Sequence, residues 1–280
     1  MRINKDSLKA RVNNIAHQLN ISQNTIYNRF FFDAFLSRLA ISKYNEKFIL
    51  KGGLYLSSLL GIESRSTIDI DFYLKKIRLE KGILFKVIQE ILNTSIDDGI
   101  NFQIVKIEDI RMDDFYGGFQ INIIGQLENV RHTFSIDVAT GDPIIPSEKN
   151  YSYKCLVSGE VLPLKTYSLE SVIAEKLQTV LARQIANSRS KDFYDLHILR
   201  KTQYENIDKD FLQSAFIETC NYRNFHITKN DALLLINEIG SNSLLQTRWD
   251  AYIKRADYAQ RIAFSDVIES IINWVEDAIK

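Results

Sequence analysis

Apolar residues recur at the spacing of an α-helix over much of the N-terminal region. Between residues 6 and 44 they fall three or four positions apart, in one run over residues 8–19 and another over residues 25–39. Because an α-helix has 3.6 residues per turn, side chains at these positions lie on one helical face. The pattern predicts two helices in this region.

The stretch between these two helices, residues 15–30, has the arrangement of apolar and small residues found in a helix-turn-helix. The second helix, however, carries Phe30, Phe31, Phe32 and Phe35. A helix that is apolar over most of its surface packs inside a protein rather than in a DNA groove. We therefore interpret the pair as core helices, with binding of duplex DNA through residues 15–30 as the alternative.

Next, the pattern changes from helix to strand. Gly52 and Gly53 open a short apolar helix, and after a polar connection residues 68–72, with the sequence IDIDF, alternate apolar and acidic side chains. Since successive strand side chains point to opposite faces, the carboxylates of Asp69 and Asp71 leave from the same face. The three apolar residues of this run are expected to be buried.

A further helix and a set of strands follow. The helix is predicted at residues 79–92, and strand-like runs occupy residues 102–107, 119–125 and 132–138. Helix, strand, helix and then consecutive strands are the order of an α/β (α+β) domain. We predict a mixed β-sheet flanked by helices.

The pattern is helical again from residue 168. Ser168 is a candidate N-cap for a helix ending near residue 187, residues 188–199 form another helix, and residues 211–280 contain three more.

A proline stands at each end of the loosely patterned stretch that precedes these helices, at positions 143 and 163. We therefore predict two domains, an α/β domain with its N-terminal helices at residues 1–150 and a helical domain at residues 151–280.

The composition is typical of a globular chain, and the formal net charge is zero. The 280 residues are 45% hydrophobic, and 35 Lys and Arg balance 35 Asp and Glu, so charge indicates neither a nucleic-acid nor a membrane partner. The two cysteines and four histidines have no metal-ligand spacing, which argues against a zinc site and suits a reducing compartment. Without a secretory or membrane-spanning segment in the sequence, a cytoplasmic location is expected.

The paired aspartates predict a metal site. Two carboxylates about 5 to 7 Å apart on an apolar strand repel each other unless a divalent cation or a shared proton offsets them, and oxygen ligands favour Mg²⁺ over zinc. Asp137 alternates with apolar residues on a later strand and could stand beside Asp69 and Asp71. A third carboxylate can bind a second metal or help to deprotonate an attacking hydroxyl. The alternative for Asp137 is a solvated aspartate before a turn.

Other residues are candidates for binding the phosphate groups of a ligand. Gly52 and Gly53 allow close approach of a ligand to the free N–H groups of the helix they open, although an ordinary strand-to-helix turn is the alternative. Lys176 falls inside the apolar stripe of its helix, where an amine needs a carboxylate or a ligand anion, and Arg183 points the same way. A lysine whose stem covers the apolar face is the alternative. Asp192 lies in the first turn of the next helix, where acids also suit the helix dipole.

Five motifs in one order carry a family resemblance. They are Lys51-Gly52-Gly53, Arg65-Ser66-Thr67-Ile68-Asp69-Ile70-Asp71, Ser135-Ile136-Asp137, Ala174-Glu175-Lys176 and Lys191-Asp192-Phe193-Tyr194-Asp195-Leu196. Together they resemble the AbiEii/AbiGii toxin family, bacterial nucleotidyltransferases with a DNA polymerase beta-like fold. The resemblance covers roughly residues 30–200.

This resemblance implies a Mg²⁺-dependent transfer of a nucleotide from a nucleoside triphosphate to an acceptor, in a toxin–antitoxin or abortive-infection system. The expected catalytic residues are Asp69, Asp71, Asp137, Lys176 and Asp192, of which the first three hold Mg²⁺. The expected nucleotide-binding residues are Lys51, Gly52, Gly53, Arg65, Thr67, Lys176 and Arg183. A cognate antitoxin is the implied partner, and tRNA is the acceptor used by some family members.

One position departs from the wider nucleotidyltransferase pattern, which has Ser or Thr directly after the glycine that opens the helix. This chain has Leu54 there. Phosphate binding would then depend on backbone N–H groups and Lys176. A catalytically silent nucleotide-binding or protein-interaction module on the same fold is therefore the alternative function.

Overall fold

The computed structural model describes residues 3–110 and 117–280 and divides into two compact units. The sheet unit comprises Met1–Thr140 and Lys149–Thr166, and the helical unit comprises Gly141–Glu148 and Tyr167–Lys280. The division expected after residue 150 would separate strands at residues 149–166 from the sheet to which they are hydrogen-bonded. Each unit is described by itself.

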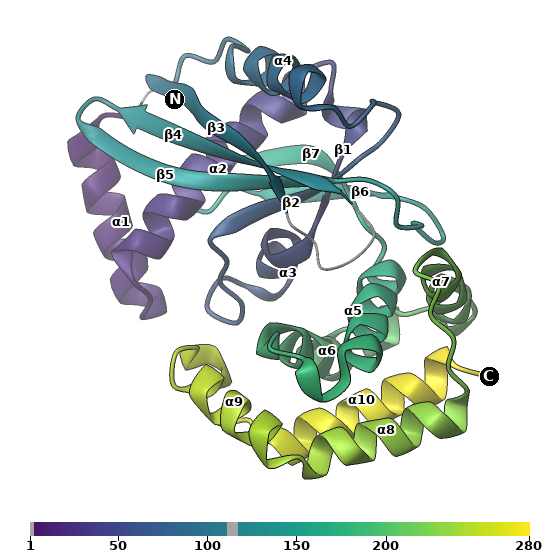
Figure 1. Ribbon diagram of the computed structural model, residues 1–280. Coiled ribbons are helices and arrows are strands. Elements are labelled where there is room, and N and C mark those ends of the chain that lie inside the picture. The colour runs from purple at the N-terminus through teal and green to yellow at the C-terminus, as the bar shows by residue number, and fades with distance from the viewer. Residues whose placement is uncertain (1–2, 111–116) are drawn as a thin grey trace. The chain divides into compact units, whose positions relative to one another are not determined.

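The sheet unit consists of a mixed β-sheet with helices on both faces (Figure 1). The strands of its described residues lie in the order β3-β4-β5-β2-β1-β7-β6. In chain order the elements are α1 (Lys5–Leu19), α2 (Gln23–Ile41), the 3-10 helix η1 (Asn45–Lys47), β1 (Phe48–Lys51), α3 (Gly52–Leu60), β2 (Asp69–Leu74), α4 (Lys81–Leu92), β3 (Ile100–Ile110), β4 (Gly118–Leu127), β5 (Val130–Ala139), β6 (Lys149–Lys154) and β7 (Val161–Thr166).

The two faces of the sheet differ in what covers them. Phe72 on β2 and Phe134 on β5 contact phenylalanines of α2, and α4 packs beside α2 on this apolar face (Figure 1). Helix α3 packs on the opposite face, against β1 and β2. The predicted α/β fold with a mixed sheet flanked by helices is confirmed.

The N-terminal helices belong to the core. Asn4 caps α1 and Ser22 caps α2, each accepting a hydrogen bond from a backbone N–H three residues on. Phe31, Phe32 and Phe35 of α2 are at most 1% exposed. The interpretation of α2 as a core helix is confirmed.

Strands β6 and β7 were not expected from the sequence. They pair with each other, and β7 runs parallel to β1, which was also not predicted as a strand. Only Tyr153 of β6 is buried, and β7 contains Pro163. An edge strand with one buried residue has no alternation to recognise, and a proline argues against a strand.

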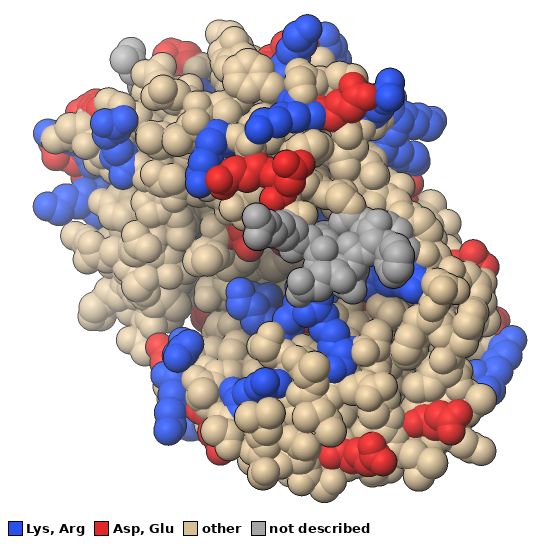
Figure 2. Space-filling model, viewed as in Figure 1, with Lys and Arg blue, Asp and Glu red and all other residues tan. Residues whose placement is uncertain are grey.

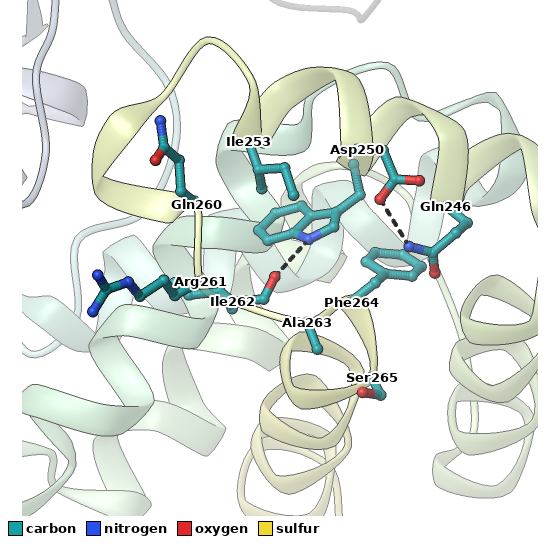
Figure 3. Close-up of a pocket in the computed structure, with 10 residues that line it drawn as sticks. Gln246, Asp250, Ile253, Gln260, Arg261, Ile262, Ala263, Phe264 and Ser265 are labelled. Atoms are coloured by element: carbon teal, nitrogen blue, oxygen red, sulfur yellow. Dashed lines mark hydrogen bonds between the residues drawn. The ribbon is translucent and has the colours of Figure 1, made fainter.

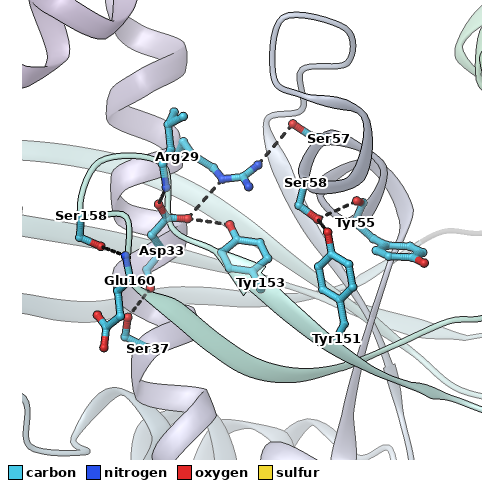
Figure 4. A network of polar contacts seen from close by, with 11 residues as sticks. Arg29, Asp33, Ser37, Tyr55, Ser57, Ser58, Tyr151, Tyr153, Ser158 and Glu160 are labelled. Atoms are coloured by element: carbon cyan, nitrogen blue, oxygen red, sulfur yellow. Dashed lines mark hydrogen bonds and ion pairs between the residues drawn. The ribbon is translucent and has the colours of Figure 1, made fainter. Parts of the chain in front are cut away.

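A buried polar network joins β6 to α2 and α3 (Figure 4). Asp33 pairs with Arg29 at 3.2 Å and accepts hydrogen bonds from the Tyr153 hydroxyl and the Leu156 N–H, both at 2.6 Å. Arg29 also donates to the Ser57 hydroxyl of α3. A buried carboxylate is tolerated only when its charge and lone pairs are matched in this way.

Two tyrosines of β6 provide a test of this network. We expect Tyr153→Phe to lower the free energy of unfolding by about 1.5 to 3 kcal/mol, because it removes a donor from a buried carboxylate. Tyr151→Phe, which loses only a hydroxyl contact with Ser58 at 3.0 Å, should cost about 0.5 to 1.5 kcal/mol. Urea unfolding of both variants measures the difference, and equal losses would argue against a special role for Asp33.

The helical unit contains one long helix more than was expected beyond residue 208. Its elements are α5 (Leu169–Arg183), η2 (Gln184–Ala186), α6 (Ser190–Thr202), η3 (Tyr204–Asn206), α7 (Lys209–Tyr222), α8 (Lys229–Ser241), α9 (Ser243–Ile253), η4 (Asp257–Ala259) and α10 (Phe264–Ala278). Asn242 alone separates α8 from α9, and its side chain caps α9. In residues 3–110 and 117–280 there is no helix with the length and apolar character to cross a membrane.

Candidate functional site

Three aspartates lie on one face of the sheet, at the neighbouring strands β2 and β5. These strands are parallel, with Asp71 opposite Asp137 and Asp69 opposite Ser135. Residues opposite each other in a ladder project from the same face. This face is the one that α3 packs against, so the carboxylates stand away from the phenylalanine core.

The apolar neighbours of the acids behave differently from one another. Ile70 and Phe72 are at most 1% exposed, as expected, but Ile68 is 68% exposed. Its expected burial is wrong because β2 begins only at Asp69, so the strand alternation does not extend to residue 68.

The start of α3 reaches Asp71. The Gly53 N–H donates to Asp71 Oδ2 at 3.1 Å. Gly52 has φ +61°, and a Cβ there would lie 1.9 Å from the same oxygen, while a Cβ on Gly53 would lie 2.5 Å from Thr67 Oγ1. Both glycines are therefore needed for the helix N-terminus to approach Asp71 and Thr67.

A matched pair of glycine variants isolates this close approach. Gly159 also has a positive φ, +74°, but a Cβ there would have nothing within 4 Å. Gly159→Ala thus adds backbone strain alone, whereas Gly52→Ala adds strain and a clash with Asp71. We expect Gly52→Ala to lower the free energy of unfolding by at least about 1 kcal/mol more than Gly159→Ala, as measured by urea unfolding. Equal costs would contradict the tight fit.

Each aspartate has a different hydrogen-bond partner. Thr67 Oγ1 donates to Asp69 Oδ1 at 2.6 Å, and Gln120 Nε2 on β4 donates to Asp137 Oδ1 at 2.9 Å. These bonds fix one oxygen of each carboxylate.

Three further residues lie at or near the N-terminus of α3. Lys51 lies opposite Asp71 across β1 and β2. Arg65 is 3% exposed, and its Nη2 lies 3.5 Å from the Cβ position of Gly53. Leu54 is fully buried, so its side chain belongs to the core.

Burial and neighbouring charge raise the pKa of two of the acids, Asp71 and Asp137. Burial, followed by the charges of Asp69 and Asp137, raises the pKa of Asp71 from 3.8 to about 6, although the Gly53 N–H and Lys51 act in the opposite direction. Burial also raises the pKa of Asp137, as does the charge of Asp69. A cation beside these groups would relieve the repulsion.

Whether a metal ion fits is decided by the donor set. No group of three or more His, Cys, Asp or Glu side chains in the described parts of the chain is arranged to enclose a metal ion. The charged donors at β2 and β5 are carboxylate oxygens, and they repel one another. This chemistry fits Mg²⁺, which commonly takes one or two carboxylates together with substrate phosphates and water.

A second cluster of predicted residues lies in the helical unit. Lys176 of α5 pairs with Asp192 Oδ1 at 2.9 Å and with Asp195 Oδ2 at 2.7 Å, both on α6. The Lys176 side chain is 15% exposed and the two carboxylates at most 5%. Burial lowers the pKa of Lys176, but the two acids outweigh it and raise the pKa above its ordinary value. The buried amine thus meets carboxylates, and Arg183 lies in the last turn of α5.

The predicted site residues therefore form two groups. The sheet unit brings together the three aspartates with the residues around the start of α3, namely Lys51, Gly52, Gly53, Arg65 and Thr67. The helical unit brings Lys176 together with Asp192. Two partners were not assigned from the sequence. Gln120 could be found only from the pairing of β4 with β5, whereas Asp195 lies three residues after Asp192, on the same face of α6 and within the same sequence motif.

The helical unit also has a cavity of about 430 Å³ between α9 and α10 (Figure 3). Trp249 is 1% exposed, and its indole N–H donates to the Ile262 carbonyl at 3.0 Å. Asp250 accepts a hydrogen bond from Gln246 at the rim. None of the predicted site residues lines this cavity.

Comparison with known proteins identifies relatives. The family model for "Nucleotidyl transferase AbiEii toxin, Type IV TA system" matches residues 34–270. A crystal structure of a Helicobacter pylori protein assigned to the nucleotidyltransferases is 18% identical, with a TM-score of 0.52, over 91% of this chain and 95% of that chain. JHP933 from Helicobacter pylori is 17% identical, with a TM-score of 0.52, over 91% of both chains. At these identities the structures show a shared fold. No curated protein matches.

Proposed function

Since the chain belongs to the AbiEii nucleotidyl transferase toxin family of type IV toxin–antitoxin systems, we propose that it transfers a nucleotide from a nucleoside triphosphate to an acceptor hydroxyl. The observation that carries this proposal is the meeting of three carboxylates with the N-terminus of α3. Asp71 lies opposite Asp137 and also accepts the Gly53 N–H. Acids beside the N-terminus of a helix suit a metal-bound phosphate.

Asp69 and Asp71 would hold Mg²⁺, and Asp137, which lies beside them on β5, would accept a proton rather than bind the same ion. When bound, Mg²⁺ supplies positive charge that offsets the phosphates and the leaving pyrophosphate. The raised pKa of Asp71 supports this role, because its carboxylate is poorly compensated by the protein alone.

The residues around the start of α3 would bind the triphosphate. Gly52 and Gly53 let the Asp71 carboxylate and the Thr67 hydroxyl lie against the helix N-terminus, whose N–H groups attract anions. Arg65 and Lys51 add positive charge, and Thr67 adds a hydroxyl directly beside Gly53. To donate to a phosphate at the helix start, where position 54 is leucine, this hydroxyl would turn away from Asp69 Oδ1, to which it donates in the structure.

In the reaction, the oxygen of the acceptor hydroxyl attacks the α-phosphorus. A new P–O bond forms, the bond between the α-phosphorus and the bridging oxygen breaks, and pyrophosphate leaves with that oxygen. The hydroxyl proton passes to Asp137 Oδ2, since Oδ1 is engaged by Gln120. The raised pKa of Asp137 makes it a better proton acceptor than an ordinary surface aspartate.

Lys176 is proposed to contact the nucleotide phosphates, with Asp192 as a further acid and Arg183 as a second cation. An ammonium group has three N–H donors, and the two carboxylates of α6 accept two of them. One donor then remains for a phosphate oxygen. Asp192 and Asp195 would hold the amine in position.

The partners follow from the family. A type IV toxin–antitoxin family implies an antitoxin, and a cytoplasmic location suits such a pair. We propose tRNA as the acceptor, as in some proteins that the sequence resembles.

A labelled-transfer assay tests the function. The protein is incubated with Mg²⁺, total RNA and each of the four nucleoside triphosphates carrying a label on the α-phosphate, and RNA and protein are then separated. We expect label on RNA in the tRNA size range. Binding of a triphosphate without any transfer would overturn the proposal and support a silent nucleotide-binding module.

A further inference from the structure

Strand β3 forms one edge of the sheet and, within the described residues, has a neighbouring strand on one side only (Figure 1). It is 11 residues long and contains no proline, whereas β6 at the opposite edge has six residues. A long edge strand presents a row of backbone N–H and C=O groups that can pair with a strand of another chain. Of the two edges, β3 is therefore the one better suited to extend the sheet.

The charges in the middle of β3 complement each other when the strand is reversed. Lys106 and Glu108 project from the same face, pair with each other at 2.7 Å, and are 54% and 51% exposed. A lysine on an edge strand usually opposes pairing with another chain. When two copies of β3 run antiparallel about Ile107, however, Lys106 of each copy lies opposite Glu108 of the other, so opposite charges meet at both places. This match is specific to a second copy of the same strand.

Large apolar side chains are exposed beside this edge. Val105, the extra residue at the register shift in β3, is 51% exposed, and Phe85 of α4 is 47% exposed. Helix α4 packs against β3 and α2. Phe85 lies about 140° around α4 from Glu90, which accepts a hydrogen bond from Tyr44 just beyond the end of α2. Phe85 is thus on the flank of α4 that faces away from α2, towards the free edge of β3.

We propose that β3 pairs antiparallel with β3 of a second copy of this chain, about a twofold axis at Ile107, so that two sheets join into one. The same surface is used by both copies, so the contact closes as a dimer. Backbone hydrogen bonds hold the two strands together, and Lys106 with Glu108 fixes their register. Val105 and Phe85 lose exposure to water on pairing. This inference does not depend on the proposed nucleotide transfer.

Charge reversal tests this pairing. Sedimentation velocity of the wild type over a dilution series should show a dimer that dissociates at low concentration. Lys106→Glu and Glu108→Lys should each raise the dissociation constant at least about 10-fold, because two attractive contacts across the axis become two repulsive ones. Lys149→Glu makes the same charge change at an exposed position of the other edge strand, β6, and should dimerise as the wild type does.

Mixing the two single variants separates strand pairing from a general effect of charge. In an equimolar mixture the two negative side chains of one chain face the two positive side chains of the other, so a heterodimer should form, which also shows that both variants are folded. The double variant Lys106→Glu/Glu108→Lys should dimerise like the wild type. A wild type that stays monomeric up to about 100 μM, single variants that dimerise as the wild type does, or a mixture that stays monomeric would each overturn the inference.

Discussion

Asp71→Asn should reduce nucleotide transfer by at least about 100-fold while leaving a more stable protein. The loss follows because Asp71 would be a metal ligand, and charge stabilisation by a bound metal amounts to several kcal/mol. The gain follows because Asp71 is buried beside Asp69 and Asp137 and its pKa is raised to about 6. An asparagine removes the repelling charge and can still accept the Gly53 N–H through its carbonyl oxygen.

The pH dependence of the stability gain identifies its cause. An acid whose pKa rises from 3.8 to about 6 on folding stabilises the fold when protonated, and this contribution is lost as pH rises between these values. In the absence of metal, the wild type and Asp71→Asn should therefore differ little in stability near pH 4. Above pH 6 Asp71→Asn should be the more stable, by on the order of 2 kcal/mol.

The control is Asp109→Asn, which changes an exposed aspartate on β3 of the same sheet. It should change neither transfer nor stability, since surface substitutions usually stay within about 0.5 kcal/mol. Initial transfer rates and urea unfolding at several pH values measure both effects. An Asp71→Asn protein with wild-type turnover in Mg²⁺ would remove Asp71 from the chemistry.

Lys176→Met should destabilise the protein by about 3 to 5 kcal/mol and also abolish transfer. The substitution keeps the length and apolar stem of the side chain but removes the Lys176 ion pair from both buried carboxylates, while Asp192 keeps its pair with the exposed Arg189 at 3.1 Å. Lys191→Met, at an exposed position of α6, is the matched control and should have little effect on either property.

A triple variant separates the structural role of Lys176 from its proposed catalytic role. Adding Asp192→Asn and Asp195→Asn to Lys176→Met removes the buried charges that Lys176 offset and should recover most of the lost stability. Transfer should remain absent, because no amine is left to contact the phosphates. Recovery of both stability and transfer would show that Lys176 acts through folding alone.

The acidic strand could be predicted because its signal is local. Alternation with a period of two places Asp69 and Asp71 on one face whatever strands lie beside them. The cation at Lys176 was also predictable as a charge within an apolar stripe that needs a partner. Its partners, Asp192 and Asp195, lie on the next helix.

Long-range pairing could not be read from the sequence. The alignment of Asp71 with Asp137 depends on the register of β2 with β5, which are separated by β3 and β4 along the chain. The register of β4 with β5 places Gln120 beside Asp137. Register is specified by the packed sheet as a whole, so Gln120 was missed.

Local signals were missing or misleading elsewhere. The burial expected for Ile68 failed because the strand starts one residue later. Strand β6 lacks a buried alternating set, β7 alternates but contains Pro163, and α8 and α9 are separated by a single capping residue. Each case is an element whose boundary or existence depends on tertiary contacts.

The fate of the α- and γ-phosphates of one nucleoside triphosphate tests the proposed transfer most directly. Parallel reactions contain Mg²⁺, total tRNA and the same nucleoside triphosphate, labelled either on the α-phosphate or on the γ-phosphate. We expect the α label on RNA, the γ label only in released pyrophosphate, and both products absent with Asp71→Asn. Label from the γ-phosphate on RNA, or equal products from the wild type and Asp71→Asn, would contradict nucleotide transfer at these aspartates.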